Sequence, residues 1–443
     1  MKSMKPSRIA ALYFLIIGIL ALMCLLVPED GIHIDLRWPT MSEMLDQQTD
    51  TTAKKQVAKT DTVAAEPEVD ENAVDTVKDT RYYLTRFYQS LDSTKAKSIR
   101  IVHYGDSQLE EDRMTMILRR NMQSKYGGGG VGLLPLHQTI PTRTLNQGTY
   151  INGRRQDKKQ GPKRYLVYGP KDMHRSDGLY GVMGQSALLD NSRVAGSERL
   201  EVSVQTVGDS TATERYFSRI RLVADPGITM RANGQDVQNQ QLIALKDSTR
   251  SARILFTGQG QVYGFSLETP TGMQVDNIPM RGCSGFVFTA MSKKQCADYF
   301  RATNTRLIIM QFGGNAIGNN SQATIKYNVE TLRKQVRVMK ECAPEASIVF
   351  IGPSDMLVRR KGNLQTNEGV PYMDSLLLRM AQEEKIGYWS LYEAMGGRNS
   401  MIRWQEQNLA GKDGIHFTHK GADRAGQLLA DWLEEGKKMV VGH

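Results

Sequence analysis

Two regions of the chain alternate buried strands with helical stripes, and a middle region of different pattern separates them. In the first region, residues 99–104 read Ile-Arg-Ile-Val-His-Tyr, a mostly apolar run that predicts a buried strand. Beyond this run, apolar residues recur at helical spacing, at Met114, Ile117, Leu118 and Met122. This spacing predicts a helix after the strand.

The middle region, residues 143–275, contains short runs in which apolar and polar residues alternate. Examples are Leu200–Val204, Arg219–Val223, Ala252–Phe256 and Val262–Leu267. A period of two predicts half-buried strands. The segment Ala232-Asn233-Gly234-Gln235 is a candidate hairpin turn, because Asn-Gly favours the positive φ angles of a tight turn. We therefore expect an inserted β-sandwich.

From residue 276 onwards, strand and helix patterns alternate again. Strands are predicted at Leu307–Phe312, Ser347–Gly352 and Gly387–Ser390, and helices at Ile325–Glu341, Tyr372–Glu384 and Gly421–Glu435. Such alternation predicts an α/β fold, a parallel sheet with helices on both faces. Ser107, Asn315 and Ser354-Asp355 each follow a predicted strand, and polar groups at the carboxyl ends of parallel strands meet at one edge.

The first 80 residues differ from both patterns. A basic flank, residues 1–8, precedes an uninterrupted apolar run at residues 9–27. As a helix this run is about 28 Å long, enough to span a bilayer once. The basic flank favours the cytoplasmic side, so we expect the remainder to be extracytoplasmic, on the periplasmic face. A cleaved signal peptide is the rival interpretation, but no small-residue cleavage site follows the run. Cleavage as a lipoprotein before Cys24 is also disfavoured, because the bulky Met23 lies where a small residue would be needed.

Residues 41–80 are rich in Thr, Asp, Glu, Lys, Ala and Val and contain almost no aromatic side chains. Such a segment buries too little apolar surface to fold, so we expect a flexible linker. The expected organisation is a basic flank at 1–8, a transmembrane anchor at 9–27, a linker at 28–80, an α/β domain at 81–142 and 276–443, and a β-rich, carbohydrate-binding-like insertion at 143–275.

The charge favours no single partner. Lys and Arg number 57 against 47 Asp and Glu, a formal net charge of +10, which suits an anionic surface or polymer outside the cell and equally suits simple solubility. The basic residues are dispersed, which together with export argues against nucleic acid.

The number and spacing of cysteines and histidines limit the possible disulfide bridges and metal sites. Beyond the apolar run there are three cysteines, Cys283, Cys296 and Cys342, so at most one bridge can form. A Cys283–Cys296 bridge and three reduced cysteines both remain open. Outside the His416–His419 turn, no Cys/His pair has the spacing of metal ligands, so we expect neither metal nor cofactor.

A serine, a histidine and a carboxylate are the candidate catalytic groups. Ser107 follows the first strand in a Gly105-Asp106-Ser107 turn, but a helix-capping serine gives the same pattern. A serine hydroxyl needs a base to become a nucleophile. His416 is the candidate base and His419 its competitor. Asp413, three residues before His416, favours His416, because a carboxylate on Nδ1 fixes the tautomer.

A third block, Gly313-Gly314-Asn315, offers a side-chain amide to an oxyanion, although alone it also fits a plain loop. The blocks Gly105-Asp106-Ser107, Gly313-Gly314-Asn315 and Asp413-Gly414-Ile415-His416 together resemble the first, third and fifth blocks of the SGNH (GDSL-type) hydrolase family. The resemblance implies that Ser107 is the nucleophile, His416 the base and Asp413 its partner. The implied fold is a flavodoxin-like three-layer α/β/α sandwich, here with an inserted β-sandwich domain.

The second block of the family is matched by Cys283-Ser284-Gly285, which gives Gly285, with Gly282 as the alternative. The resemblance then implies an oxyanion hole made by the backbone N–H groups of Ser107 and Gly285 and the amide of Asn315. The sequence departs from the family in two places, with Gln108 in place of leucine and Ala316 where an acidic residue is frequent.

A narrower resemblance extends beyond the first block. Residues 105–108 continue to Asp112-Arg113-Met114-Thr115, Tyr126-Gly127 and Gly130-Val131-Gly132. This run is similar to the start of the bacterial peptidoglycan O-acetylesterases, which carry a β-rich insertion at the same place. The insertion of this chain contains four tyrosines that could stack against sugars, Tyr165, Tyr168, Tyr180 and Tyr263. Packing in the core of the sandwich is the alternative role of each.

The resemblance implies an extracytoplasmic serine esterase that removes O-acetyl groups from a cell-envelope polysaccharide such as peptidoglycan, through an acetyl-enzyme. Its partners would be the acetylated glycan and, through residues 9–27, the membrane. Two alternatives remain open. One is an O-acetyltransferase of the same fold, supplied by a membrane acyltransferase, and the other is a non-catalytic glycan-binding protein.

Overall fold

The structure is a computed structural model that describes residues 79–157, 161–190, 199–238, 241–318 and 321–442. The expected anchor at 9–27 and nearly all of the expected linker lie outside these residues. In the described part of the chain, no helix has both the length and the apolar character needed to cross a membrane.

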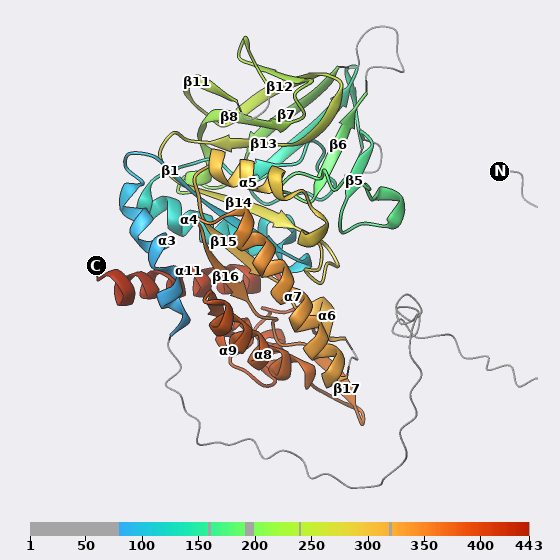
Figure 1. The fold of residues 1–443 in the computed structure, drawn as a ribbon, viewed down its shortest axis with the longest axis vertical. Coiled ribbons are helices and arrows are strands. Elements are labelled where there is room, and N and C mark those ends of the chain that lie inside the picture. Colours follow the sequence, from blue (N-terminus) through green and yellow to red (C-terminus); the bar gives the residue numbers. More distant parts are fainter. Residues whose placement is uncertain (1–78, 158–160, 191–198, 239–240, 319–320, 443) are drawn as a thin grey trace, which may run out of the picture. The chain divides into compact units, whose positions relative to one another are not determined.

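Five parallel strands form the central sheet, in the order β14-β1-β15-β16-β19 (Figure 1). Their bounds are β1 Ser98–Gly105, β14 Gly272–Pro279, β15 Thr305–Gln311, β16 Ser347–Ile351 and β19 Gly387–Trp389. Numbered along the chain, this is the flavodoxin-like order 2-1-3-4-5. The order reverses between β1 and β15, so a crevice is expected at the carboxyl ends of these two strands.

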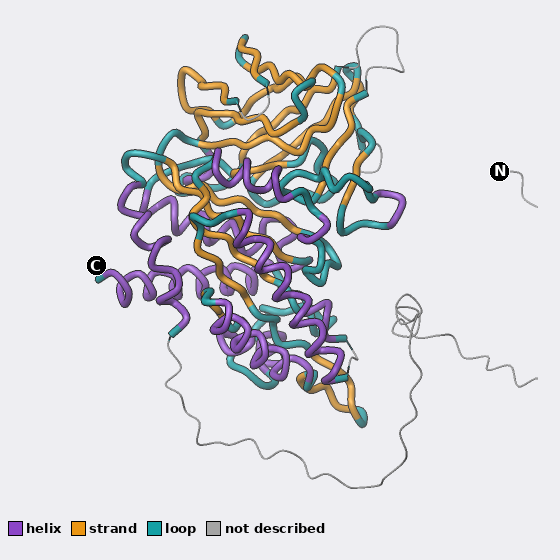
Figure 2. The backbone as a smooth tube through the Cα atoms, viewed as in Figure 1, coloured by secondary structure: helices purple, strands orange, loops and turns teal. Residues whose placement is uncertain are grey.

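Helices cover both faces of this sheet, in three layers that Figure 2 shows as purple helices around orange strands. One face carries α5 Lys293–Ala302, α7 Gln322–Cys342 and α8 Gly369–Glu384, and the other carries α3 Thr85–Ser90, α4 Arg113–Tyr126 and α11 His419–Val441. On β1, Val102 belongs to the first core and Ile101 to the second, as the alternation of a strand requires. The predicted α/β fold with a parallel sheet is confirmed.

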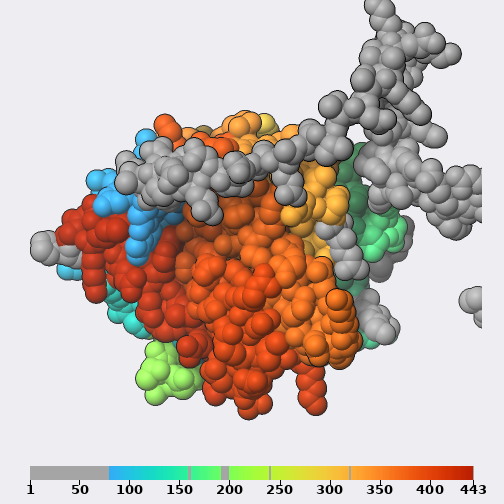
Figure 3. Space-filling view, turned by 90° about the horizontal axis from the view of Figure 1, so that it is seen from below, coloured from blue at the N-terminus to red at the C-terminus, as the bar shows by residue number. Residues whose placement is uncertain are grey.

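Shorter elements complete the α/β part. They are α6 Gly314–Ile317, α9 Leu391–Met395, α10 Ser400–Glu406, the hairpin β17 Leu357–Arg360 and β18 Asn363–Thr366, and the 3₁₀ segments η1 Thr80–Leu84, η2 Leu91–Ser93, η3 Ser107–Asp112 and η7 Phe288–Ala290. Seen from below, orange and red segments of the C-terminal part cover most of the visible face (Figure 3).

The insertion is a sandwich of two antiparallel sheets around a third core. One sheet has the order β10-β9-β12-β7-β3-β4, with β3 Leu145–Ile151, β4 Arg154–Arg155, β7 Leu200–Thr206, β9 Ile228–Ala232, β10 Gln235–Val237 and β12 Ser251–Gly258. The other has the order β11-β8-β13-β6-β5 with β2 also on β13, and comprises β2 Gly132–Leu134, β5 Arg164–Leu166, β6 Gln185–Leu189, β8 Phe217–Ala224, β11 Leu242–Thr249 and β13 Gly260–Glu268. Among its described residues, the insertion also contains the short 3₁₀ segments η4 Lys171–Met173 and η6 Thr213–Arg215.

The predicted Asn-Gly turn joins β9 to β10. Ala232 pairs with Gln235, and the two residues between them have positive φ angles, 50° at Asn233 and 75° at Gly234. These angles are those of a two-residue hairpin turn, so this prediction is confirmed.

Both expected boundaries of the insertion move in the structure. β2 falls within 81–142 but pairs with β13 of the sandwich, and β14 begins before residue 276 but pairs with β1 of the central sheet. The alternation pattern missed β14 because Gln274 and Asp276 are fully buried in it, so polar residues occupy interior positions.

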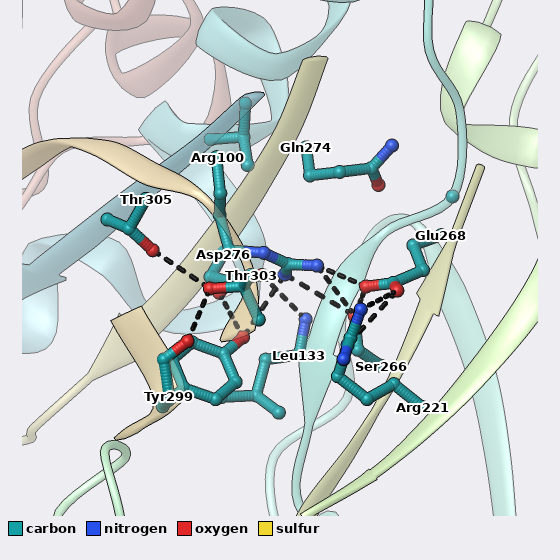
Figure 4. Close-up of polar contacts among 12 residues, drawn as sticks. Arg100, Leu133, Arg221, Ser266, Glu268, Gln274, Asp276, Tyr299, Thr303 and Thr305 are labelled. Carbon is teal, nitrogen blue, oxygen red and sulfur yellow. Dashed lines mark hydrogen bonds and ion pairs between the residues drawn. The ribbon is translucent and has the colours of Figure 1, made fainter. Parts of the chain in front are cut away.

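A buried charge network joins the sandwich to the central sheet (Figure 4). Arg100 on β1 donates to Asp276 Oδ1 on β14 at 2.5 Å and to the hydroxyl of Tyr299 at 3.1 Å. Its other terminal nitrogen pairs with Glu268 on β13, which also accepts from Arg221 Nε at 3.1 Å. Two guanidinium groups and two carboxylates are thus balanced inside the protein.

This network makes Arg100 a strong determinant of stability. We expect Arg100→Met to lower the free energy of unfolding by about 3–5 kcal/mol, because it leaves buried carboxylates without their cation. Chemical denaturation of the full-length protein measures the loss. The control is Arg253→Met, since Arg253 is 83% exposed and lies 3.9 Å from Glu201, and we expect it to change stability by under about 0.5 kcal/mol. Equal losses in both variants would contradict this role of Arg100.

All three cysteines of the described part are buried free thiols. The Cys283–Cys296 bridge, one of the two open interpretations, is therefore not formed. Cys296 on α5 instead forms a hydrogen bond with Cys342 at the end of α7, and this bond together with burial raises the pKa of Cys296.

Candidate active site

The sequence-predicted catalytic residues come from three segments at the carboxyl edge of the central sheet. Ser107 begins η3 directly after β1, Asn315 lies in α6 after β15, and His416 lies in the turn before α11. The turn after β1 is tight. A Cβ atom at Gly105 would lie 2.7 Å from the side chain of Leu109, so the turn has no space for a side chain there.

Ser107, His416 and Asp413 form a hydrogen-bonded chain. Ser107 Oγ lies 2.9 Å from His416 Nε2, and His416 Nδ1 lies 2.8 Å from Asp413 Oδ2. Asp413 Oδ1 accepts from the backbone N–H groups of Ile415 and His416, both at 3.0 Å. Burial acts to raise the pKa of Asp413, but these hydrogen bonds outweigh it and the pKa lies below its usual value. Asp413 is therefore an ionised partner that holds the imidazole with Nε2 towards the serine.

The competing histidine is engaged elsewhere. His419 Nε2 lies 2.5 Å from Glu111 Oε2, and this bond lowers the pKa of Glu111. Of the two histidines, His416 is thus the one whose imidazole contacts Ser107.

A small cavity of about 140 Å³ opens beside these groups. Ser107, Asn315 and His416 line it together with Phe312 and Met356. Its size suits a short acyl group next to the serine hydroxyl. Among the described residues, no group of three or more His, Cys, Asp or Glu is placed to hold a metal ion.

Comparison with known proteins extends this description. No protein-family model matches the sequence, and no curated protein matches it. Among solved structures, a peptidoglycan O-acetylesterase is similar with a TM-score of 0.62 and 21% identity, over 81% of this chain and 96% of that one. The chain has the SGNH hydrolase fold. The covered share exceeds the two α/β segments, so the likeness includes the inserted sandwich.

Other carbohydrate esterases with the SGNH fold are similar over a smaller part. A carbohydrate acetylesterase from Sinorhizobium meliloti has a TM-score of 0.27 and 13% identity, over 37% of this chain and 79% of that one. An acetyl xylan esterase has a TM-score of 0.28 and 8% identity, over 36% of this chain and 81% of that one.

In this SGNH fold, the amide of Asn315 is fully engaged inside the protein. Its Nδ2 donates to Asp106 Oδ2 and to the carbonyl of Cys283, both at 3.2 Å. An amide nitrogen carries two hydrogens, so an oxyanion must displace or share one of these acceptors.

The backbone N–H of Gly285, the glycine of the second block, does not point into the small cavity. The N–H of Gly285 donates to Cys283 Sγ at 3.3 Å. A Cβ atom at Gly285 would lie 2.7 Å from the ring of Phe312, and its φ angle is +88°, so this position requires glycine for packing. The alternative, Gly282, has a φ angle of +72° and open space around its Cβ position.

Gln108 is a positioning residue that the sequence revealed only as a departure from the family. Its Nε2 donates to the carbonyl of Ile415 at 2.8 Å, and its Oε1 accepts from the N–H of Phe417 at 3.3 Å. Gln108 therefore fastens both sides of His416 to the segment that carries Ser107. Its place directly after the nucleophile is the one signal in the sequence that points to this role.

Of the other two polar residues that follow a predicted strand, Asp355 has a structural role. Asp355 is fully buried and accepts from the backbone N–H groups of Met356 and Met401, both at 2.9 Å, so it fixes the start of α10. Its neighbour Ser354 lines the cavity.

The four candidate stacking platforms differ in access. Tyr180 and Tyr263 are buried, and the hydroxyl of Tyr263 donates to Asp225 Oδ1 at 2.6 Å, so both are core residues. Tyr165 is partly buried between Lys163 and Arg175, whose cationic groups lie 5.2 and 5.0 Å from its ring. Tyr168 lines a second cavity, described below.

Removal of the Asn315 amide tests its part in catalysis. We expect Asn315→Ala to lower kcat for ester hydrolysis by about 10²- to 10³-fold, the usual loss for one oxyanion donor. The KM is expected to change little, because the oxyanion exists only in the transition state. Steady-state kinetics on a chromogenic acetyl ester measure both constants, and a loss confined to KM would contradict the role.

Asp106, the acceptor for Asn315, has an unusual acidity. Burial raises the pKa of Asp106 to about 6, against smaller opposing contributions from the N–H of Gln108 and from His416. Because the pKa is higher in the folded than in the unfolded chain, the contribution of this carboxyl to stability is fully present below about pH 4 and is lost as the pH rises to about 6.

This titration predicts the effect of Asp106→Asn. We expect the free energy of unfolding of the variant, relative to the unaltered protein, to increase by about 2–3 kcal/mol between about pH 4 and about pH 7. Urea denaturation at several pH values measures this difference. A difference that does not change with pH would contradict it.

Proposed function

We propose that the protein is a serine esterase that removes O-acetyl groups from an extracytoplasmic cell-envelope polysaccharide such as peptidoglycan. One observation carries the proposal, the chain of hydrogen bonds at 2.9 and 2.8 Å from Ser107 through His416 to Asp413, beside a cavity of acetyl size. The likeness to a solved peptidoglycan O-acetylesterase over 96% of that chain supports the choice of substrate.

The geometry supports a two-step mechanism. Ser107 Oγ attacks the ester carbonyl carbon while His416 Nε2 takes the hydroxyl proton. The tetrahedral oxyanion forms beside Asn315, and its collapse expels the sugar hydroxyl, which receives the proton from His416. Water, deprotonated by His416, then attacks the acetyl-enzyme, and acetate and free Ser107 result.

The location of the protein is part of the proposal. The basic flank at 1–8 and the apolar run at 9–27 support a single-pass anchor with the esterase on the periplasmic face. The length and acidic-polar composition of residues 28–80 support a tether between the anchor and the catalytic part.

Acetate release tests the proposal against its two alternatives. The full-length protein is incubated with O-acetylated peptidoglycan and with a chromogenic acetyl ester, and de-O-acetylated peptidoglycan is the control substrate. We expect turnover of the chromogenic ester, and release of acetate from the acetylated glycan but not from the de-O-acetylated control. Turnover of the small ester without acetate from the glycan would favour an O-acetyltransferase, and added acceptor sugars should then become acetylated. Turnover of neither substrate would favour a glycan-binding protein.

A further inference from the structure

A second cavity lies between the central sheet and the inserted sandwich, with a volume of about 370 Å³. η3 and β14 contribute Glu110 and Asn277 to its wall, and β5 and β6 contribute Arg164 and Gln185. η3 begins with Ser107, so the cavity and the catalytic serine share one short segment.

One of the arginine side chains that line this cavity has no carboxylate partner among the described residues. Its three carboxylates already have side-chain partners, because Glu110 and Asp112 pair with Arg281 and Arg119 and Glu111 forms a hydrogen bond with His419. Arg164 also lines the cavity and is half-buried. In the described part of the chain, no carboxylate pairs with its guanidinium. The wall thus presents one guanidinium group that no carboxylate partners.

The burial of Arg164 makes its positive charge unfavourable in the absence of a bound anion. Burial lowers the pKa of Arg164, and the neighbouring Tyr168 opposes this shift only in part. A guanidinium that has lost water without gaining an acceptor is stabilised strongly by an anion with two oxygens, which can bind it in a bidentate manner. Leu134, Leu166 and Met183 in the same wall offer apolar contact to the carbon atoms around such an anion.

We infer that this cavity is a subsite for a carboxylate on the substrate glycan, with Arg164 as its counter-ion. The inference rests on the proposed function and adds to it that the enzyme recognises an acidic sugar near the acetylated one. A carboxylate fits better than a phosphate, because a phosphate dianion would leave one negative charge uncompensated near three carboxylates. The carboxylate can come from a lactyl ether, as on N-acetylmuramic acid, or from the ring of a uronic acid.

A binding experiment separates the subsite from catalysis. Full-length Ser107→Ala is titrated by calorimetry with a disaccharide of N-acetylglucosamine and N-acetylmuramic acid, with the same disaccharide as its carboxamide, and with a disaccharide that contains glucuronic acid. We expect the free carboxylate to bind about 10-fold or more tightly than the carboxamide. The better of the two acidic disaccharides identifies the source of the carboxylate.

Two further variants test the residue. In the Ser107→Ala background, Arg164→Gln is expected to weaken binding of the carboxylate about 10-fold and to leave binding of the carboxamide unchanged. Lys163→Gln is the matched control, since it removes the same charge from the preceding residue, which is exposed and lies over Tyr165 outside the cavity. Equal weakening in both variants, equal affinity for carboxylate and carboxamide, or no binding of any probe would overturn the inference.

Kinetics distinguish failure of the inference from failure of the proposed function. With acetylated, carboxylate-bearing glycan, Arg164→Gln is expected to raise KM about 10-fold with little change in kcat. A loss confined to kcat would overturn the subsite. If the unaltered protein released no acetate but the binding pattern held, the subsite would stand and the esterase proposal would fall.

Discussion

Ser107→Ala is expected to lower kcat for acetyl-ester hydrolysis by about 10⁵-fold or more, the loss seen when a triad nucleophile is removed. The expectation follows from the position of Ser107 Oγ, which lies 2.9 Å from the base His416 and faces the small cavity. Acetate release and ester turnover measure the loss. Rapid quenching followed by mass spectrometry should also find acetylated Ser107 in the unaltered protein and none in the variant.

The same cavity provides a matched control. Ser354 also lines it, but no histidine contacts its hydroxyl among the described residues, so Ser354→Ala is expected to have a far smaller effect on kcat. If the two variants lost the same activity, or if an acetyl group were found on Ser354, the assignment of the nucleophile would be wrong.

Asp413→Asn is expected to lower kcat by about 10⁴-fold while the protein stays folded. The carboxylate accepts from His416 Nδ1 at 2.8 Å and so keeps Nε2 free to act as the base. An asparagine amide at this place can donate to Nδ1 and stabilise the wrong tautomer. The oxygen that accepts the N–H groups of Ile415 and His416 is retained in asparagine, so the turn should persist.

His419→Gln is the control for this prediction. His419 also pairs with a carboxylate, that of Glu111, but it does not contact Ser107. We expect its replacement to change kcat by less than about 10-fold. A loss from His419→Gln as large as that from Asp413→Asn would contradict the choice of His416 as the base. Circular dichroism and thermal unfolding check that both variants fold.

The sequence predicted the site where its chemistry is local. Asp413 and His416 are three residues apart in one turn, and Ser107 and Asn315 follow apolar runs that the structure shows as adjacent strands β1 and β15. A buried strand and its carboxyl end can be read from a short window, and the parallel sheet then brings distant windows together. The roles of these four residues in catalysis remain predictions.

The sequence failed where a residue acts through contacts distant along the chain. Gln108 binds the backbone on either side of His416, about 300 positions away. β14 was missed because the polar side chains of Gln274 and Asp276 are interior, and the partner of Asp276 is Arg100 on another strand. The hydrogen bonds from the Asn315 amide to Asp106 and to the carbonyl of Cys283 likewise could not be predicted from the three sequence blocks. No periodicity records such pairings.

The buried network at Arg100 limits how this protein can have evolved. Arg100 and Asp276 are parts of the catalytic sheet, whereas Glu268 belongs to the sandwich. Deletion of residues 143–268 would remove Glu268 and leave Asp276 as the one carboxylate that pairs with Arg100 among the described residues. The insertion is therefore not a detachable module, and a lineage that lost or exchanged it would need a compensating change at Arg100 at the same time.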